Sequence, residues 1–336
     1  MTALTQGRIA VTGGAGFIGS ALIWALNNRA IEDILVVDRL HADEKWRNLV
    51  PLRFFDFMDA DDFEDLLLRS PKKLREVKTI FHMGACSSTT ETDAAFLMRN
   101  NYEYSKHVAQ FALDHKVRMI YASSAATYGA LESGLSEERP LETLRPLNMY
   151  AYSKALFDLH AQREGWLARI AGVKYFNVFG SNEQHKGEMR SVVHKAFGQI
   201  LARGSVQLFR SYRPDFGDGR QERDFIYVKD AVEMTLHLAE CGATGIFNIG
   251  SGEANTWIDL VSPIFEALGV PSNIEFIDMP ESLRPKYQYS TRAQTKRLRE
   301  SGYSAPITPL HDAVLDYVGN YLTKGCYLEP RQAVAP

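Results

Sequence analysis

One segment near the start of the chain limits the possible folds more than any other. A short β-branched and apolar run, residues 8–12, leads directly into GGAGFIG, and a helical pattern follows over residues 16–28. Gly13, Gly16 and Gly19 fall at regular intervals in this segment. Glycines at this spacing permit a tight strand-to-helix turn and let the backbone approach a pyrophosphate, which then lies at the helix N-terminus. The segment therefore predicts a strand–turn–helix unit that can bind a dinucleotide.

The next predicted strand supports this interpretation. A glycine pattern alone also fits an ordinary tight turn, but Asp38 ends a second apolar run at the expected distance after Gly19. An acidic residue here normally accepts a hydrogen bond from the adenosine ribose 2′-hydroxyl, which favours NAD. Arg39 and Lys45 could instead accommodate the 2′-phosphate of NADP. The residues alone leave NAD and NADP as alternatives.

Strands and helices alternate over the first half of the chain. The strand candidates are apolar on both faces, as expected of strands that are covered on both sides. Such alternation implies βαβ units and predicts an α/β fold class, a Rossmann-like doubly wound parallel sheet. The expected strands are residues 8–12, 33–38, 52–57, 77–83, 117–123 and 172–178, and the expected helices are residues 16–28, 60–70, 92–115 and 149–170.

After residue 178 the sequence becomes richer in glycine, arginine and polar residues, which predicts a smaller mixed α/β substrate-binding lobe built from interleaved pieces. The elements expected in this part of the chain are a helix over 189–203, a strand–helix pair over 225–240, a strand over 245–250, a helix over 256–268 and a strand over 274–278. The expected division is a dinucleotide-binding domain of residues 1–178 plus 225–252, a substrate-binding lobe of residues 179–224 plus 253–322, and a loose tail of residues 323–336.

The composition argues against several classes of function. The chain is 45% hydrophobic and 24% charged, which is ordinary for a globular protein. Its net charge of −3 gives no reason to expect nucleic acid or an anionic membrane as a partner. The three cysteines are far apart and suit neither a disulfide framework nor a metal site. We therefore expect no metal, no secretory segment and a reducing, cytoplasmic compartment.

The segment NMYAYSKALF contains the candidate reacting group. In a helix, residues four apart share a face, so Tyr150 and Lys154 point the same way and Tyr152 does not. A free phenol has a pKa of about 10, and bringing it to about 7 needs roughly 4 kcal/mol of differential stabilisation. A nearby ammonium group and a cationic nicotinamide could supply this energy. Ser124, at the end of a predicted strand, could hold a substrate oxygen against the Tyr150 phenol.

These residues carry a resemblance to a known superfamily. The glycine loop, the strand-end serine and Y-x-x-x-K, in this order, look like the extended short-chain dehydrogenases/reductases, which act largely on nucleotide sugars. The likeness extends to about residue 322. Sugar-nucleotide 4,6-dehydratases of this superfamily carry an Asp-Glu pair directly after the strand-end hydroxyl, where this chain has Ala125 and Ala126. A dehydratase is therefore not expected.

Longer strings resemble the family of ADP-L-glycero-D-manno-heptose 6-epimerases. They are HMGACSSTTETD, NNYEYSK, ASSAATYG, FNVFGSNEQHKG, RDFIYVKD and GIFNIGSG. The resemblance implies inversion of C6 in the ADP-linked heptose of the lipopolysaccharide inner core, through a 6-keto intermediate and a tightly bound NADP, with NAD as the alternative cofactor. The other functions considered are a UDP-hexose 4-epimerase and, from a different class, a catalytically silent dinucleotide-sensing protein.

Inversion by oxidation and reduction raises the need for a second acid/base. Hydride returns to the opposite face of a planar ketone, so the substrate oxygen lies on different sides in the two epimers. One phenol cannot easily serve both, and the family uses a lysine in its HKG segment, which implies a catalytic role for Lys186. The implied catalytic set is Tyr150, Lys186, Lys154 and Ser124.

The resemblance also implies the residues that contact each ligand. The cofactor positions are Gly13, Gly16, Phe17, Ile18, Gly19, Asp38, Arg39, Lys45, Met83, Gly84, Ala85, Cys86, Ser87, Asn100, Tyr150, Lys154, Val178 and Lys186. The substrate positions are Ser87, Asn177, Glu188, Lys195, Phe209, Arg223 and Tyr287. A homo-oligomer, a pentamer in this family, is implied as well.

Some positions depart from the family pattern. Ala60 replaces a cofactor-contacting lysine, Glu188 replaces a small hydroxyl residue, and Lys195 replaces a histidine, although His194 is adjacent. The segment 210–222 is several residues longer than in the enterobacterial type. These departures concern the contacts to the cofactor, sugar and pyrophosphate, and leave the expected chemistry unchanged.

Overall fold

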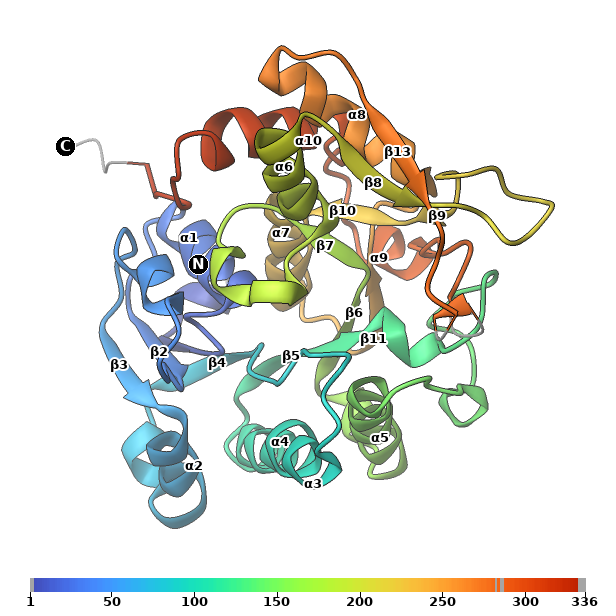
Figure 1. Cartoon of the computed structure of the whole chain (residues 1–336). Helices are drawn as coiled ribbons and strands as arrows, with labels where there is room; N and C mark the ends of the chain where they lie inside the picture. Colours follow the sequence, from blue (N-terminus) through green and yellow to red (C-terminus); the bar gives the residue numbers. More distant parts are fainter. Residues whose placement is uncertain (1–2, 282, 285–286, 332–336) are drawn as a thin grey trace.

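A seven-stranded parallel sheet forms the centre of the molecule (Figure 1). The computed structural model describes residues 3–281, 283–284 and 287–331. The sheet order is β11-β6-β5-β4-β1-β2-β3, and every neighbouring pair is parallel. The order reverses between β1 and β4, which is where doubly wound sheets bind their ligands. The strands are β1 (Arg8–Thr12), β2 (Ile34–Asp38), β3 (Asp56–Asp59), β4 (Val77–His82), β5 (Arg118–Ser124), β6 (Ala171–Tyr175) and β11 (Gly245–Ile249).

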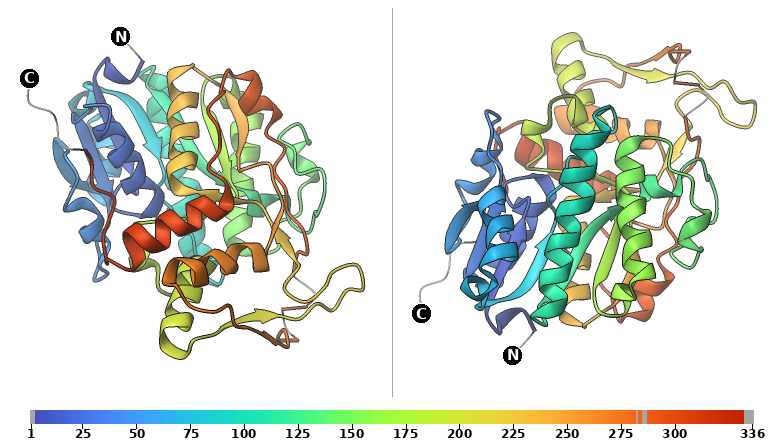
Figure 2. Two further views of the ribbon diagram at one scale, coloured as in Figure 1. Left: turned by 90° about the horizontal axis from the view of Figure 1, so that it is seen from above. Right: turned by 90° about the horizontal axis from the view of Figure 1, so that it is seen from below.

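Helices cover both faces of this sheet, as Figures 1 and 2 show. One face packs α1 (Phe17–Asn27) and α7 (Val228–Glu240), and the other packs α2 (Ala60–Arg69), α4 (Tyr104–Asp114) and α5 (Met149–Arg163). Alternate residues of one strand enter different cores: Val36 of β2 belongs to the first, and Leu35 and Val37 belong to the second. The strands are apolar on both faces because each face of the sheet packs against its own layer of helices. The predicted Rossmann-like fold class is confirmed.

A smaller group of elements lies beyond the carboxyl ends of the strands (Figure 2). Three two-stranded sheets are found here: β13 with β8, β12 with β9, and β10 with β7. Their bounds, with those of the helices beside them, are β7 (Asn177–Phe179), α6 (Val192–Arg203), β8 (Val206–Phe209), β9 (Glu222–Arg223), β10 (Phe225–Tyr227), β12 (Asn255–Thr256), α8 (Trp257–Leu268), β13 (Ile274–Ile277) and α10 (Leu310–Asp316). The short helix α9 (Lys296–Glu300) packs against β11 of the central sheet. The division of the chain into two domains stays a prediction.

Two expected strands differ from those observed. The strand expected over 52–57 is displaced to β3, because residues 52–55 are irregular: Leu52 is buried in the first core, whereas Phe55 is exposed. The strand expected over 172–178 is divided into β6 and β7. The N–H of Phe176 bonds to the carbonyl of Ile249, after which β7 leaves the central sheet and pairs with β10.

Two expected helices are also interrupted. The helix expected over 92–115 comprises α3 (Ala94–Leu97), a π-helical segment (Met98–Glu103) and α4. The helix expected over 149–170 ends at Arg163, because Gly165 adopts a left-handed conformation (φ 70°), and a short 3-10 turn follows. No helix in the described ranges is long and apolar enough to cross a membrane.

The expectation of a loose tail from residue 323 is wrong for residues 326–331. Leu328 is fully buried, and its N–H donates to the Asn182 side chain. The Trp24 indole donates to the Glu329 carbonyl, and the N–H of Arg331 donates to Asn28. An apolar anchor and these bonds therefore fix the segment against α1. Residues 332–336 lie outside the described residues.

Candidate active site

A cavity of about 1200 Å³ opens over the carboxyl ends of β1, β2, β4 and β5, at the point where the strand order reverses. Its walls come from the glycine loop, the ends of these strands, α5 and the segment 183–193. A volume of this size exceeds that of an ordinary small-molecule site, so it can hold a dinucleotide and part of a second ligand. The glycine loop forms its floor.

The glycine loop leaves no room for side chains. Gly13 has φ 66°, and a Cβ there would lie 2.6 Å from the N atom of Gly84. A Cβ on Gly19 would lie 2.1 Å from the carbonyl oxygen of Gly13. Gly16 begins α1 without a side-chain cap, so the first N–H groups of the helix are open to the cavity. The backbone therefore fits a pyrophosphate at this helix N-terminus.

Asp38 is bound by the protein itself. One of its carboxylate oxygens accepts from the N–H of Ala15 (2.9 Å), and the other accepts from the N–H of Arg39 (2.8 Å) and forms an ion pair with Lys45 (3.0 Å). These contacts tie the end of β2 to the glycine loop. Both Arg39 and Lys45 line the same end of the cavity. Arg39 also binds Asp61, at 2.6 Å, and Asn100, at 2.8 Å.

The segment after β4 forms another wall. The five expected residues of this segment, Met83–Ser87, all line the cavity, and so does Asn100. The backbone is held by Asn101, whose side chain accepts from the N–H of Cys86 (2.9 Å) and donates to Ser153 on α5 (3.1 Å). Asn101 is fully buried and was not predicted, because a single asparagine in a helical pattern carries no sequence signal. The five residues are Met83, Gly84, Ala85, Cys86 and Ser87.

Ser124 and Tyr150 meet in the cavity. Ser124 ends β5 and accepts from the N–H of Ala126, which fixes its hydroxyl. Tyr150 is in the first turn of α5, which Asn148 caps by accepting from Ala151. Burial raises the pKa of Tyr150, and its hydrogen bond with Ser124 opposes that rise. Burial therefore favours the neutral form of the phenol.

Lys154 follows Tyr150 by one helical turn and lies in the same cavity. Its ammonium group donates to the carbonyl of Ala122 on β5 (2.8 Å). Burial lowers the pKa of Lys154 to about 8, and Asp158 opposes that shift. Burial is the largest cause of the raised Tyr150 pKa. The expected lowering by Lys154 together with a cationic nicotinamide stays a prediction.

Lys186 lies in the same cavity as Tyr150 and Ser124. It belongs to a 3-10 segment, Gln184–Met189, and its ammonium nitrogen lies 5.4 Å from the ring centroid of Phe17. Burial lowers the pKa of Lys186, while Glu183 opposes that shift. A lowered pKa brings the ammonium and free-amine forms closer in energy, as a group that both gives and takes up a proton requires. Phe17, Ile18, Val178 and Asn177 also line the cavity.

Arg223, Phe209 and Tyr287 form a separate cluster that adjoins the cavity. The Arg223 guanidinium lies 5.1 Å from the ring centroid of Tyr287 and 5.6 Å from that of Trp257. Tyr287 packs edge-on against Phe209 and accepts from the Trp257 indole (2.8 Å). Trp257 also lines the cavity, so it joins the cluster to the reacting groups. It was not predicted, because only the folded chain brings the start of α8 to this place.

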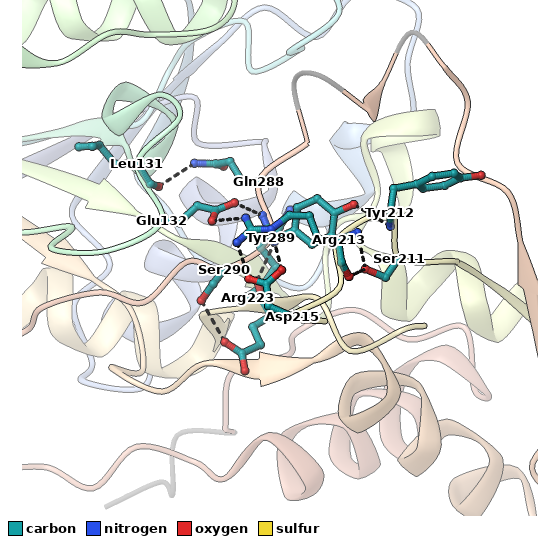
Figure 3. Close-up of polar contacts among 11 residues, drawn as sticks. Leu131, Glu132, Ser211, Tyr212, Arg213, Asp215, Arg223, Gln288, Tyr289 and Ser290 are labelled. Atoms are coloured by element: carbon teal, nitrogen blue, oxygen red, sulfur yellow. Dashed lines mark hydrogen bonds and ion pairs between the residues drawn. The ribbon is translucent and has the colours of Figure 1, made fainter. Parts of the chain in front are cut away.

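The segment 210–222, which is longer than in the enterobacterial type, lies beside this cluster (Figure 3). Arg213 forms ion pairs with Glu132 (2.6 Å) and Asp215 (2.5 Å), and its guanidinium lies over the ring of Tyr289. Glu132 also accepts from the N–H of Tyr289 (2.6 Å). Three loops that are distant in the sequence are therefore joined next to Arg223, as Figure 3 shows.

Glu188 and Lys195 are placed differently from the other expected site residues. They pair with each other at 3.5 Å, the Glu188 side chain is fully exposed, and neither residue lines the cavity. His194 does not line the cavity either. Its backbone N–H donates to the Ser191 side chain, which caps α6. These side chains are not brought together with the reacting groups.

Known proteins share both the sequence and the fold of this chain. The family model described as "NAD dependent epimerase/dehydratase family" matches residues 9–250. A protein of Nitratidesulfovibrio vulgaris (strain DP4) named ADP-L-glycero-D-manno-heptose-6-epimerase is 52% identical over 93% of this chain and 97% of its own length. A protein of the same name from Fusobacterium nucleatum is 43% identical over 94% and 98% of the two chains.

Solved structures give the same result. The ADP-L-glycero-D-manno-heptose-6-epimerase of Helicobacter pylori has a TM-score of 0.79 and 25% identity, covering 95% of this chain and 97% of its own. The UDP-glucose 4-epimerase of Thermus thermophilus, a complex with NAD, has a TM-score of 0.72 and 26% identity over 93% and 98% of the chains. The chain therefore belongs to the NAD dependent epimerase/dehydratase family, among the relatives named ADP-L-glycero-D-manno-heptose-6-epimerase.

Proposed function

We propose that the protein is an ADP-L-glycero-D-manno-heptose 6-epimerase, which converts ADP-D-glycero-β-D-manno-heptose into its L-glycero epimer for lipopolysaccharide inner-core synthesis. One observation carries the proposal: a single cavity, in a chain 52% identical to a relative of this name, is lined by a serine–tyrosine pair and by a lysine from a different segment. A simple dehydrogenase needs only the first pair, whereas inversion needs a second acid/base.

The residues of the chain would divide the reaction as follows. When bound, a nicotinamide dinucleotide would supply the hydride chemistry for oxidation and reduction at C6 of the sugar. Tyr150 exchanges the proton of the 6-oxygen in one epimer, and Lys186 exchanges it in the other. Ser124 orients that oxygen through its hydroxyl. Lys154 holds the nicotinamide ribose and supplies positive charge close to Tyr150.

The cofactor that we propose is NADP, one molecule tightly bound per subunit, with NAD as the alternative. Both oxygens of Asp38 already accept hydrogen bonds from the chain, which leaves the carboxylate poorly placed for a ribose 2′-hydroxyl. Arg39 and Lys45 line that end of the cavity as two cations. The partner of Arg39, Asp61, is largely exposed, so a 2′-phosphate could replace it. Heat-denatured protein should release NADP, and release of NAD alone would contradict this part of the proposal.

For the ADP group we propose the cluster around Arg223. Arg223 is 9% exposed and forms no ion pair with the residues that the structure describes. A buried guanidinium without a carboxylate is costly unless a ligand supplies the negative charge. A diphosphate does so, and the guanidinium can bind it in a bidentate manner. The aromatic rings of Phe209, Tyr287 and Trp257 provide flat surfaces beside it.

A homo-oligomer in the cytoplasm, a pentamer by family resemblance, completes the proposal. Trp46, Val50 and Phe55 support an interface, because three large apolar side chains in one short segment are 46%, 69% and 61% exposed. Light scattering of the purified protein would measure the subunit number directly. A monomer at micromolar concentration would contradict this part.

The central experiment follows C6 by NMR after the protein is mixed with the D-glycero epimer and no added cofactor. Equilibration of the two epimers is the expected result. Tyr150→Phe and Lys186→Met should each lower turnover by about 10²- to 10⁴-fold while fold and bound cofactor stay intact. UDP-galactose serves as the competing substrate. Turnover of UDP-galactose alone would show a UDP-hexose 4-epimerase, and near-normal turnover by Lys186→Met would refute the two-base scheme.

A further inference from the structure

The segment that carries Lys186 is closed by one buried carboxylate. Glu183 is 1% exposed. One of its oxygens accepts from the N–H of Ser191 (2.6 Å), and the other accepts from the hydroxyls of Ser191 (2.6 Å) and Tyr317 (3.0 Å). Ser191 also caps α6 by accepting from the N–H of His194. Glu183 therefore joins the start of the 183–191 loop to the start of α6 and to the C-terminal π-helical segment (Tyr317–Leu322).

Lys186 lies inside this closed loop. Its N–H donates to the carbonyl of Glu183 (3.0 Å), and the loop then turns at Gly187, whose φ of 53° suits glycine. Both Glu183 and Lys186 line the large cavity. The loop is also held from below: the Asn182 side chain donates to Ser20 on α1 (2.9 Å). The backbone that carries Lys186 is therefore held by Glu183, by the turn at Gly187 and by the bond of Asn182 to α1.

The hydrogen bonds of Glu183 all come from uncharged groups. Its three donors are uncharged, and no ion pair within 4 Å involves it in the described ranges. Burial raises the pKa of Glu183, and Lys186 opposes that rise; burial lowers the pKa of Lys186, and Glu183 opposes that fall. Each group therefore stabilises the charged form of the other.

Several other titratable groups lie near the loop. Burial lowers the pKa of His185 to about 4, so it is neutral at working pH. Glu188 is paired with Lys195 in solvent. The remaining titratable or charged groups on the elements around the loop are Arg190 on the loop itself, Asp38, Asp43 and Lys45 beside His185, Tyr317 on the C-terminal segment, and Tyr150 across the cavity.

We propose that Glu183 is a positioning residue for Lys186, because its carboxylate closes the loop that carries the lysine and both residues line the same cavity. The inference rests on the proposed role of Lys186 as the second acid/base. Such a group must give a proton in one direction of the epimerisation and accept one in the other. A carboxylate in the same cavity favours the ammonium form, which is the form that acts as the acid.

The test compares Glu183→Gln with Tyr317→Phe in the cofactor-bound protein. Lys186 is labelled with an amine-reactive reagent at a series of pH values, and mass spectrometry of its peptide gives the labelling midpoint. Glu183→Gln removes the charge and should lower the midpoint by about one pH unit. Tyr317→Phe removes one hydrogen bond, keeps the charge and should leave the midpoint unchanged. An unchanged midpoint in Glu183→Gln, or an equal shift in both variants, would overturn the inference.

A second variant covers the case in which Glu183→Gln does not fold. Glu183→Asp keeps the charge but shortens its reach, so the loop is held less well. Turnover should fall about tenfold or more at unchanged KM, while the labelling midpoint moves by less than about half a pH unit. A turnover equal to that of the unaltered protein would refute the positioning role.

The labelling measurement needs no substrate, so the two proposals can fail separately. A shifted midpoint in Glu183→Gln, with no turnover of ADP-heptose by the unaltered protein, would refute the proposed function alone. Normal turnover with an unshifted midpoint in Glu183→Gln would refute the role of Glu183 alone.

Discussion

Arg223 shows how one side chain can be selective through what surrounds it. Two aromatic rings and the backbone of Glu222 hold its guanidinium, and burial lowers its pKa. Its neighbour Arg213 has two carboxylate partners, whereas Arg223 has none among the described residues. The unpaired arginine is therefore the one prepared for an anionic ligand.

Arg223→Lys should raise the KM for the nucleotide sugar by about 10- to 100-fold with little change in kcat. A lysine keeps the charge but loses the bidentate and stacking contacts. Steady-state kinetics over a range of substrate concentrations measures both constants. Arg213→Lys is the matched control and should leave KM within about threefold. An equal rise in both variants would place the diphosphate elsewhere.

His82 makes the stability of the protein sensitive to acid. Its ring is 1% exposed between Thr12 and Ser105, and burial lowers its pKa to about 3. The unfolded chain has a histidine pKa of about 6.5, so as pH falls below that value the unfolded state binds a proton first. The stabilising contribution is complete above pH 6.5 and is lost progressively towards pH 3.

His82→Gln should flatten this dependence. Between pH 6.5 and pH 5 the unfolding free energy should fall by about 2 kcal/mol less than in the unaltered protein. Urea unfolding at a series of pH values gives the slope. His311→Gln is the control, because Glu266 and Asp312 raise the pKa of that exposed histidine. Equal slopes with and without His82 would mean that its burial does not control acid stability.

Helix α5 combines a reacting face with a buried charged anchor. Tyr150, Lys154 and Asp158 follow one another by single turns, so they share a face. Asp158 accepts from Tyr121 (2.9 Å) and Ser123 (2.7 Å) of β5 and pairs with Lys174 of β6 at 3.1 Å. The helix is thereby fixed in rotation against two strands of the sheet.

Lys174→Met should lower the unfolding free energy by about 3–5 kcal/mol. Asp158 and Lys174 are both almost completely buried, and removal of one leaves the other charge without a partner. The double variant Lys174→Met with Asp158→Leu should recover a substantial part of the loss. Chemical denaturation of the single and double variants measures the coupling. A double variant less stable than either single one would contradict the argument.

The elements of the central sheet could be predicted because each depends mainly on local sequence. The glycine loop, the apolar strands and the four-residue spacing of Tyr150 and Lys154 can all be seen in short windows. β7 could not be separated from β6 in this way, because the division depends on Phe176 bonding to Ile249, far away in the chain. The same holds for Trp257 and Asn101, whose roles arise from contacts that no local pattern encodes.

The predicted site residues divide into those at the ends of sheet strands, which local sequence places, and those outside the sheet, which it does not. Residues that follow a strand of the sheet, such as Asp38, Ser87 and Ser124, line the cavity because the carboxyl ends of parallel strands meet there. Glu188 and Lys195 are on loop and helix positions outside the sheet, and they turn towards solvent. Lys186 was implied only by family resemblance, and nothing in its own spacing distinguishes it from a solvated loop lysine.

At the scale of the whole molecule, the segment 326–331 joins the two ends of the chain. It binds α1 through Trp24 and Asn28, and it binds the base of the Lys186 loop through Asn182. Ser181 and Gln184 donate to the carbonyl of Cys326. A segment expected to be loose is thus part of the support under the proposed second acid/base.

Leu328→Ala should lower the unfolding free energy by about 2–5 kcal/mol, because a fully buried leucine is replaced by a cavity. It should also reduce turnover more than cofactor binding, because the segment 326–331 supports the loop that carries Lys186. Urea unfolding and cofactor content measure the two effects. Glu329→Ala is the control, because only the backbone of that residue is bonded. Equal effects of both substitutions would contradict the assignment.

The contact between Leu328 and Asn182 joins two residues that are synthesised at different times. The two residues are 146 positions apart. A ribosome adds about 5–20 residues per second, so Asn182 waits about 7–30 s for its partner. All seven strands of the central sheet have been made by residue 249, well before Leu328 is added. A nascent chain can therefore complete its dinucleotide fold first, and the loop of Lys186 gains its last support only when synthesis has passed residue 328.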